Sequence, residues 1–389
     1  MIPVFSPPKL FGGSQRVAYL VSKGLVKKGH EVVIYTSDMS NLQERVGKFI
    51  ENINGVTIVH FRNISPFLSR KTRIIITPEM TKSLEIEIKN FDIIHVHEAR
   101  SFQHLVVWWL ARKKGVPYVV QAHGNLSEHF GGFFRRIYDE LFGKKILKDA
   151  SRVIAVNKVE ARDYARFGVQ EGKVEIIPNP VDMDEFCNLT TRGAFREKYN
   201  IKPDSKIILF MGRIHPVKGV DILLHAFGSI VKERKVNATL VVAGPDDGYL
   251  KECINIAKMY QLNNVIFTGQ LGDLERIHAY LDADVVVIPS KYEMFPMTAL
   301  EAYACGKPVV ASKVGGVKDL VVEKVTGLLV EQGNVNQLAY SLLFLLNNVD
   351  RANEMGLRGK CFVRENFSIE KIVYRLEQLY EDVINTCKS

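Results

Sequence analysis

Short runs rich in valine and isoleucine alternate with longer segments of helical spacing along most of this chain. The first half contains six such runs, at residues 31–35, 56–61, 92–97, 118–121, 152–156 and 174–177. Helical patterns separate many of them, as at residues 16–28, 102–114 and 134–148. Apolar strands that alternate with helices are typical of a parallel sheet covered on both faces. The pattern therefore predicts an α/β fold.

The alternation pauses in the middle of the chain and then resumes. A Pro-Asn-Pro-Val-Asp segment at residues 178–182 and a polar stretch to about residue 205 precede a second series of runs. These runs lie at residues 206–211, 239–243, 265–268, 284–288 and 308–311. Because 389 residues exceed the usual size of a single core, we expect two Rossmann-like domains, residues 1–190 and 191–368. A last helical segment, about residues 369–389, is expected to pack back on the first domain.

Composition narrows the class of protein. The chain is 47% hydrophobic and 24% charged, as is usual for a soluble globular protein, and no apolar run reaches the length of a membrane span. Its five cysteines include no Cys-x-x-Cys pair, which argues against a disulfide framework and a zinc site. The first residues lack the pattern of a signal peptide. We therefore expect a cytoplasmic protein. His95, His97 and Glu98 lack a third ligand of convincing spacing, so no metal is expected.

Positive charge is concentrated in the first half. The net charge is +9, and residues 1–180 sum to +10. Apolar residues are mixed with cations at residues 130–138 and 141–148, a combination that suits peripheral contact with an anionic membrane on its inner face. The alternative, slightly favoured, is a helix with one face in the core and a solvated cationic face. A nucleic-acid partner is not expected, because no binding motif accompanies the charge.

The most informative segment is the strand, loop and helix at residues 284–302. Pro296 is expected in the first turn of the helix, so the amides of Phe295, Met297 and Thr298 should face outward and suit a diphosphate. Glu293 lies before the helix, and Glu301 lies roughly 7 to 8 Å further along its axis. Two carboxylates so placed suit the hydroxyl-rich ends of a nucleotide sugar. The alternative is a solvated Glu293 and an exposed Glu301, but the position after a parallel strand favours the ligand site.

Two cations are expected at the same edge of the sheet as Glu293. Arg213 and Lys218 follow the first strand of the second domain and could stabilise the charge on a departing nucleoside diphosphate. The less favoured alternative is a pair of solvated loop cations. In the first domain, Gly12 and Gly13 open a helix, and His123 ends a strand and is expected to face the cleft between the domains. Each of these first-domain signals is weak by itself.

Together these motifs resemble the retaining glycosyltransferases of the GT-B fold, family four, over nearly the whole chain. The motifs are Gly12-Gly13, His123-Gly124, residues 178–182, Gly212-Arg213 with Lys218-Gly219, and Glu293 with Glu301. The resemblance implies two Rossmann-like domains facing each other across a cleft. It also implies a nucleotide-sugar donor, such as a UDP- or GDP-sugar, a hydroxyl acceptor and no metal or other cofactor.

The resemblance assigns expected roles to individual residues. The donor-binding set would be Gly12, Gly13, Arg213, Lys218, Glu293, Phe295, Pro296, Met297, Thr298 and Glu301. Within it, Arg213 and Lys218 would bind the diphosphate, Glu301 the ribose, and Glu293 the sugar hydroxyls. His123 would contact the transferred sugar, and His123, Arg213, Lys218 and Glu293 would form the catalytic set. The retaining mechanism implied is front-face attack, in which the leaving phosphate takes the acceptor's proton and no protein nucleophile is needed.

The sequence departs from the family pattern in three places. The first strand is short, since the family has several more residues before Pro3, which calls the start of the sheet into question. Pro180 stands where the family often has glycine. Residues 294–297, Met-Phe-Pro-Met, replace the commoner Gly-Phe-Gly-Leu.

Two other functions compete with glycosyl transfer. One is a sugar-nucleotide epimerase on the same fold, and the other is a non-catalytic carbohydrate- or membrane-binding protein. A nicotinamide dehydrogenase is least favoured, because the first turn lacks the Gly-x-Gly-x-x-Gly fingerprint. The base, the sugar and the acceptor stay open, and the acceptor could be a glycan, a lipid-linked sugar or a small molecule.

Overall fold

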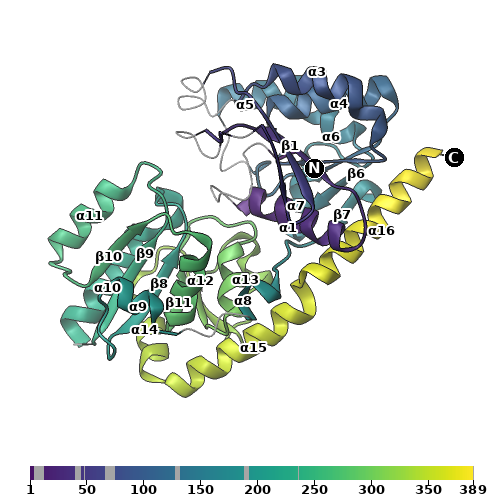
Figure 1. The fold of residues 1–389 in the computed structure, drawn as a ribbon. Coiled ribbons are helices and arrows are strands. Elements are labelled where there is room, and N and C mark those ends of the chain that lie inside the picture. Colours follow the sequence, from purple (N-terminus) through teal and green to yellow (C-terminus); the bar gives the residue numbers. More distant parts are fainter. Residues whose placement is uncertain are drawn as a thin grey trace. The chain divides into compact units, whose positions relative to one another are not determined.

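The computed structural model divides the chain into two compact units (Figure 1). Unit 1 comprises Met1–Pro180 together with Ile369–Ser389, and unit 2 comprises Val181–Ser368. The structure describes the whole chain except residues 4–12, 40–44, 48, 66–74, 128–131, 188–191, 235 and 389. Both units are α/β with mostly parallel strands, so the predicted fold class is confirmed.

Unit 1 contains two sheets joined by the first residues of the chain. Its strands are β1 (Val33–Ser37), β2 (Ile50–Ile53), β3 (Val56–Phe61), β4 (Ile94–His97), β5 (Tyr118–Gln121), β6 (Arg152–Ala155) and β7 (Val174–Ile176). They are ordered β1-β3-β2 and β4-β5-β6-β7, and only β2 is antiparallel. The amide of Ile2 donates to His95 O at 2.9 Å, and Met1 O accepts from Tyr35 N at 3.0 Å. The short first strand therefore still bonds to both β4 and β1.

Helices cover both faces of these strands. They are α1 (Gly13–Lys27), α3 (Pro78–Glu87), η1 (Ile88–Asn90), α4 (Phe102–Lys114), α5 (Phe133–Tyr138), η3 (Asp139–Gly143), α6 (Lys144–Asp149), α7 (Lys158–Arg166), η4 (Glu171–Lys173) and α16 (Ile369–Lys388). The C-terminal helix α16 packs along α1 (Figure 1). A Cβ at Gly24 would lie 2.5 Å from Val373 Cγ2, so this contact needs a residue without a side chain.

Unit 2 is a six-stranded parallel sheet in the order β10-β9-β8-β11-β12-β13. Its strands are β8 (Lys206–Met211), β9 (Ala238–Ala243), β10 (Val265–Gly269), β11 (Val285–Ile288), β12 (Val309–Ser312) and β13 (Gly327–Val330). Its helices are α8 (Met183–Cys187), α9 (Ala194–Lys198), η5 (Pro216–Lys218), α10 (Val220–Arg234), α11 (Leu250–Met259), α12 (Asp273–Asp282), α13 (Met297–Ala304), η6 (Gly315–Asp319), α14 (Val335–Asn347) and α15 (Val349–Phe367). The strand order reverses between β8 and β11.

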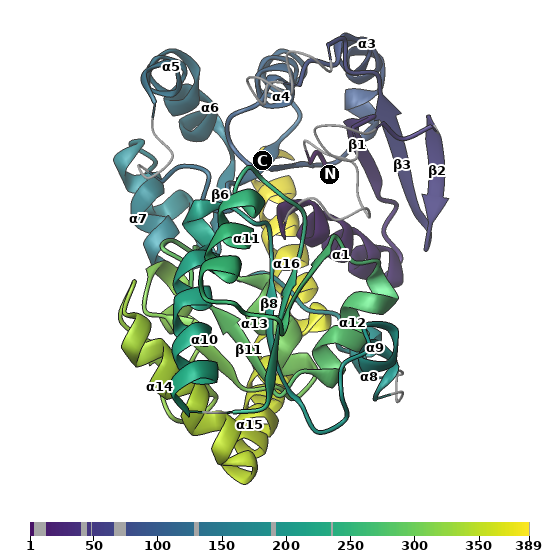
Figure 2. The ribbon, with the colours of Figure 1, turned by 90° about the vertical axis from the view of Figure 1, so that its left-hand side faces the viewer.

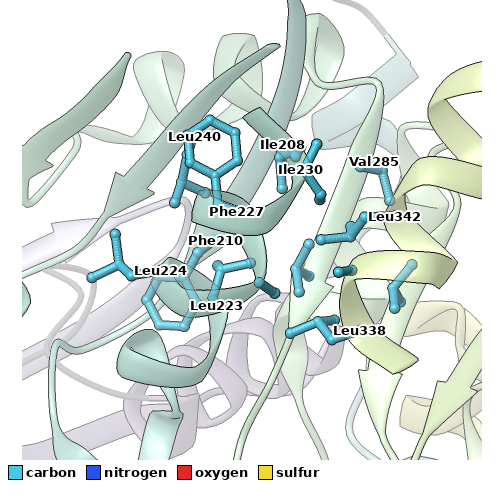
Figure 3. Packing of buried hydrophobic residues seen from close by; sticks show 14 of the residues in the cluster. Ile208, Phe210, Leu223, Leu224, Phe227, Ile230, Leu240, Val285, Leu338 and Leu342 are labelled. Carbon is cyan, nitrogen blue, oxygen red and sulfur yellow. The ribbon is translucent and has the colours of Figure 1, made fainter. Parts of the chain in front are cut away.

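The core of unit 2 fixes the positions of these two strands. Ile208 and Phe210 are two residues apart on β8 and point to the same face, where α10 and α14 pack (Figure 3). Figure 3 also shows Leu223, Phe227 and Leu342 in this cluster. Full burial of each such side chain contributes about 1.5 to 3 kcal/mol. The ends of β8 and β11 are therefore anchored on a large apolar core.

The units meet in sequence at Pro180 and Val181, ten residues before the predicted boundary. The amide of Val181 donates to Phe367 O at 2.9 Å, so the chain already bonds to the end of α15 there. Glu185 on α8 forms an ion pair with Arg276 at 2.8 Å. These contacts assign residues 181–187 to unit 2, which sequence spacing alone did not indicate.

Candidate active site

The candidate site lies where β8 and β11 end. In open α/β sheets, ligands bind beyond the carboxyl ends of the strands at the point where strand order reverses. β8 leads into the loop with Arg213 and Lys218, and β11 leads into the loop with Glu293. The topology therefore confirms the prediction that these two loops lie at the same edge of the sheet.

Lys218 and Glu293 form the centre of this edge. Lys218 Nζ lies 2.5 Å from Glu293 Oε1, and Ser290 Oγ donates to the same oxygen at 2.9 Å. The side chains of Lys218 and Glu293 are only 22% and 12% exposed, so neither is the solvated loop residue of the alternative interpretation. Gly219 has φ +69, and a Cβ there would lie 2.0 Å from Pro289 O. The two loops thus touch through backbone, which holds the ion pair in place.

Arg213 lies on the same loop as Lys218 but pairs with a different acid. Its guanidinium forms an ion pair with Asp247, from the loop after β9. That loop is fixed to the Arg213 loop by backbone bonds, since Ile214 N donates to Pro245 O at 2.9 Å and Asp247 N donates to Ile214 O at 3.1 Å. Arg213 is 31% exposed and can exchange partners. Asp247 was not identified from the sequence, because nothing in its local pattern marks an ion pair 34 residues distant.

The start of α13 lies beside these residues. Pro296 is the N-cap, with extended backbone, and the helix begins at Met297, so the prediction that Pro296 occupies the first turn was one position wrong. Thr298 Oγ1 donates to Met211 O at 3.0 Å, which ties the helix start to the end of β8. The amides of Met297 and Thr298 have no acceptor within the helix, as at any helix N-terminus. Phe295 is buried and packs on Phe367.

Glu301 is buried rather than exposed. Only 4% of the residue is accessible, and Oε1 lies 2.8 Å from an Arg276 guanidinium nitrogen. A second guanidinium nitrogen lies 2.8 Å from Glu185. Burial alone would lower the pKa of Arg276, but the Glu301 and Glu185 carboxylates raise it above its ordinary value. Arg276 therefore supplies the buried Glu301 carboxylate of α13 with a cation. The interpretation of Glu301 as an ordinary exposed helix residue was wrong.

In unit 1, His123 occupies a strained turn at the end of β5. His123 has φ 53 and Gly124 has φ 82. The buried carboxylate of Glu160 accepts from the amides of Gly124 and Val156, and Tyr164 Oη accepts from Ala122 N at 2.8 Å. Burial raises the pKa of Glu160 to about 7. These two α7 side chains fix the conformation that presents the imidazole.

A row of histidines lies behind His123. His97 Nδ1 lies 2.9 Å from His123 Nε2, and the rings of His95 and His97 are stacked with centroids 4.2 Å apart. Burial lowers the pKa of His123 to about 3, and a contact with the Asn179 side chain offsets part of that effect. His123 is therefore neutral at physiological pH and suited to hydrogen bonding rather than to acid catalysis. Among the described residues, no cluster of His, Cys, Asp or Glu is arranged to hold a metal ion.

Two buried histidines of unit 1, His104 and His123, should make this unit less stable as the pH falls below about 6.5. Burial lowers the pKa of His104 to about 4 and that of His123 to about 3. Between those values and 6.5, the unfolded chain takes up protons that the native protein does not. The free energy of unfolding should then drop by about 1.4 kcal/mol per pH unit for each histidine. Glu160, whose pKa burial raises to about 7, takes up a proton first in the native protein and should offset the effect of one histidine, so a net loss remains. Urea unfolding followed by tryptophan fluorescence measures this in unit 1. Equal unfolding free energies at pH 7 and pH 5 would contradict it.

The glycine pair of unit 1 is only partly described. Gly12 lies outside the described residues, and Gly13 begins α1. Just after it, Ser14 Oγ and Gln15 Nε2 donate to Glu98 Oε1 at 2.8 and 3.2 Å. Glu98 follows β4 with φ 75, so its carboxylate ties the start of α1 to the strand end. The sequence marked Glu98 only as a weak metal ligand, and its bonds to α1 were not anticipated.

Comparison with known proteins identifies the family. Residues 191–361 match the family model "Glycosyl transferases group 1", and residues 11–185 match "Glycosyltransferase Family 4". An uncharacterized glycosyltransferase of Methanocaldococcus jannaschii is 32% identical over 96% of this chain and 95% of its own length. The chain therefore belongs to the family 4 glycosyltransferases. A D-inositol 3-phosphate glycosyltransferase of Kineococcus radiotolerans is 27% identical over 90% of this chain and 85% of its own length.

Solved structures agree on the fold. Sucrose-phosphate synthase from Thermosynechococcus elongatus has a TM-score of 0.82 at 24% identity and covers 99% of this chain and 98% of its own. Anabaena HepE in complex with UDP-glucose has a TM-score of 0.79 at 19% identity and covers 98% of this chain and 99% of its own. The fold is GT-B, as predicted. The prediction of a nucleotide-sugar glycosyltransferase is confirmed, and the epimerase and non-catalytic alternatives gain no support.

None of the helices within the described part of the chain combines the length and apolar character that crossing a membrane requires.

Proposed function

We propose that the protein transfers a sugar from a uridine or guanosine diphosphate donor to a hydroxyl acceptor with retention of anomeric configuration. The observation that carries this proposal is the Lys218–Glu293 ion pair beside the start of α13, at the switch point of the unit 2 sheet. Cation, carboxylate and free helix amides together match the diphosphate and hydroxyl groups of one ligand. No metal or other cofactor is part of the proposal.

Each group has a proposed role in the reaction. Lys218 and Arg213 bind the diphosphate, and the amides of Met297 and Thr298 add donors to its oxygens. When the donor binds, sugar hydroxyls replace Lys218 as partners of Glu293. As the bond between the anomeric carbon and the phosphate oxygen breaks, negative charge grows on that oxygen beside Lys218 and Arg213. The leaving phosphate takes the acceptor's proton while the acceptor oxygen bonds to the anomeric carbon on the same face.

Glu301 and His123 complete the proposed site. Glu301, paired with Arg276, accepts hydrogen bonds from the two ribose hydroxyls. His123 contacts the transferred sugar as a neutral hydrogen-bonding group. Gly13, the first residue of α1, also belongs to the proposed donor-binding set, as does Gly12, which lies outside the described residues.

A thermal-shift screen of nucleotide sugars tests the donor. A ligand at about 100 times its Kd adds roughly 2.7 kcal/mol of stability, which raises the Tm of a domain of this size by about 5 to 10 °C. UDP-glucose is the first donor to test, because HepE was crystallised with it. Failure of every nucleotide sugar to raise the Tm would contradict the proposal.

Product analysis then tests the reaction. Inositol phosphate belongs among the trial acceptors because several relatives are D-inositol 3-phosphate glycosyltransferases. Glycans and lipid-linked sugars are the other acceptor classes to test. The product should keep the anomeric configuration of the donor sugar, which NMR determines. A changed sugar nucleotide formed without any acceptor would indicate an epimerase instead.

A further inference from the structure

We propose that the outer face of the helical segment 133–149 docks on a membrane surface rich in anionic lipid. The segment passes through α5, η3 and α6 without a break, since Asp139 N donates to Arg135 O and Lys144 N donates to Asp139 O. Its inner face is apolar and buried, with Ile146 and Leu147 in the core of unit 1. The core therefore fixes the helix and leaves its outer face available.

That outer face carries large apolar side chains in water. Phe133 is 74% exposed, Leu141 54%, Ile137 41% and Phe142 38%. Phe133, Ile137 and Leu141 follow one another at intervals of four residues, which places them on one side of a helix. Isolated exposed apolar residues are common on protein surfaces, but a contiguous patch marks an interaction site. The row therefore indicates a partner that accepts apolar side chains.

The charges on this segment identify the partner's chemistry. Its three acidic residues are already matched: Asp139 binds Arg100 at 2.7 Å, Glu140 binds Lys144 at 2.5 Å, and Asp149 binds Arg112 at 2.8 Å. Four further cations on the segment, Arg135, Arg136, Lys145 and Lys148, are exposed. On membrane-binding helices of this kind, the cations bind the anionic lipid headgroups, and the apolar side chains beside them enter the region between the headgroups and the acyl chains.

The neighbouring helix α4 also exposes an aromatic and a basic side chain. α4 packs against α6, and both lie along one side of unit 1 (Figure 2). Trp109 on α4 is 50% exposed, and Lys113 Nζ lies 4.9 Å from the centre of its ring. Tryptophan is enriched at membrane interfaces because its ring is apolar and its N–H polar. A basic, aromatic surface of this kind fits a lipid bilayer better than a single peptide.

Vesicle sedimentation of the full chain tests the proposal independently of any enzymatic activity. The wild-type protein should sediment with phosphatidylcholine vesicles that contain phosphatidylglycerol and stay in solution with phosphatidylcholine alone. F133S/L141S should bind at least about tenfold more weakly, because the inserted side chains are lost. R136E/K145E should also bind at least about tenfold more weakly, and added salt should weaken wild-type binding.

Matched controls come from α15 in unit 2, which also exposes an apolar residue and a cation. L357S and R364E should sediment as the wild type does, and far-UV circular dichroism should show that every variant is folded. The proposal is overturned if the wild type stays in solution with anionic vesicles or sediments equally with neutral ones. It is also overturned if both segment variants bind as tightly as the wild type.

Discussion

Replacing Lys218 with alanine should lower kcat/KM for sugar transfer by about 10²- to 10³-fold, because one charge-matched contact to a developing anion contributes about 2.7 to 4 kcal/mol. The ammonium lies 2.5 Å from Glu293 in the ligand-free protein, so it is already in place when the donor arrives. Most of the loss should fall on kcat, since charge on the leaving phosphate grows as the bond breaks. Initial rates over a range of donor concentrations separate kcat from KM.

Lys291 offers the matched control for this experiment. It lies two residues before Glu293, and its Nζ pairs with Asp221 at 3.2 Å instead of facing Glu293. Its contact with the Lys218 loop uses the backbone amide, which donates to Val217 O and survives substitution. Lys291→Ala should therefore keep kcat/KM within about threefold of the wild type, because this partly exposed ion pair does not face Glu293. Equal losses in both variants would mean that general positive charge, rather than Lys218, carries the effect.

Glu293 and Lys218 should also behave as one unit. Glu293→Ala removes both the acceptor for sugar hydroxyls and the group that orients Lys218, so its loss should be at least as large. The double variant should then be little worse than either single variant, because residues that act together give non-additive effects. Additive losses would indicate that the carboxylate and the ammonium act separately.

Much of the fold could be predicted because the buried strands have a strong local signal. β8 (Lys-Ile-Ile-Leu-Phe-Met) and β11 (Val-Val-Val-Ile) read as nearly continuous apolar runs, and both lie inside a sheet covered by helices. β2 and β13 were missed for different reasons. β2 is a half-exposed antiparallel strand of four residues, and β13 begins with glycine, which weakens any strand pattern. Short strands such as these depend on their neighbours rather than on their own sequence.

The site could be predicted only where its residues follow strand ends. Lys218 and Glu293 meet because β8 and β11 are neighbours, and strand order follows from known rules for parallel sheets. Arg276 and Glu160 could not be found in this way. Both lie on ordinary amphipathic helices, and their importance comes from burial against Glu301 and against the Gly124 amide, which are distant in sequence. A local pattern shows that a charge exists but not that it is buried.

Replacement of Arg276 should have the second large effect, on the free energy of unfolding rather than on catalysis. Its side chain is 5% exposed and bridges Glu301 and Glu185. Arg276→Met should lower the free energy of unfolding of unit 2 by about 3 to 5 kcal/mol, because the Glu301 carboxylate is left buried without its cation. Far-UV circular dichroism in urea is the suitable probe. Both tryptophans, Trp108 and Trp109, belong to unit 1, so fluorescence reports the other unit.

A double variant distinguishes a lost ion pair from lost packing. If the uncompensated carboxylate causes the instability, R276M/E301Q should recover a large part of the loss, since the amide carries no charge. If packing of the Arg276 guanidinium over the Phe186 ring matters instead, the double variant should be no more stable than Arg276→Met. Arg358→Met is the matched control, because Arg358 is 53% exposed and its solvent-screened pair with Glu354 should add little to stability. An Arg276→Met protein as stable as that control would show that this ion pair does not stabilise unit 2, and the proposed role of Arg276 in supporting the ribose ligand would be wrong.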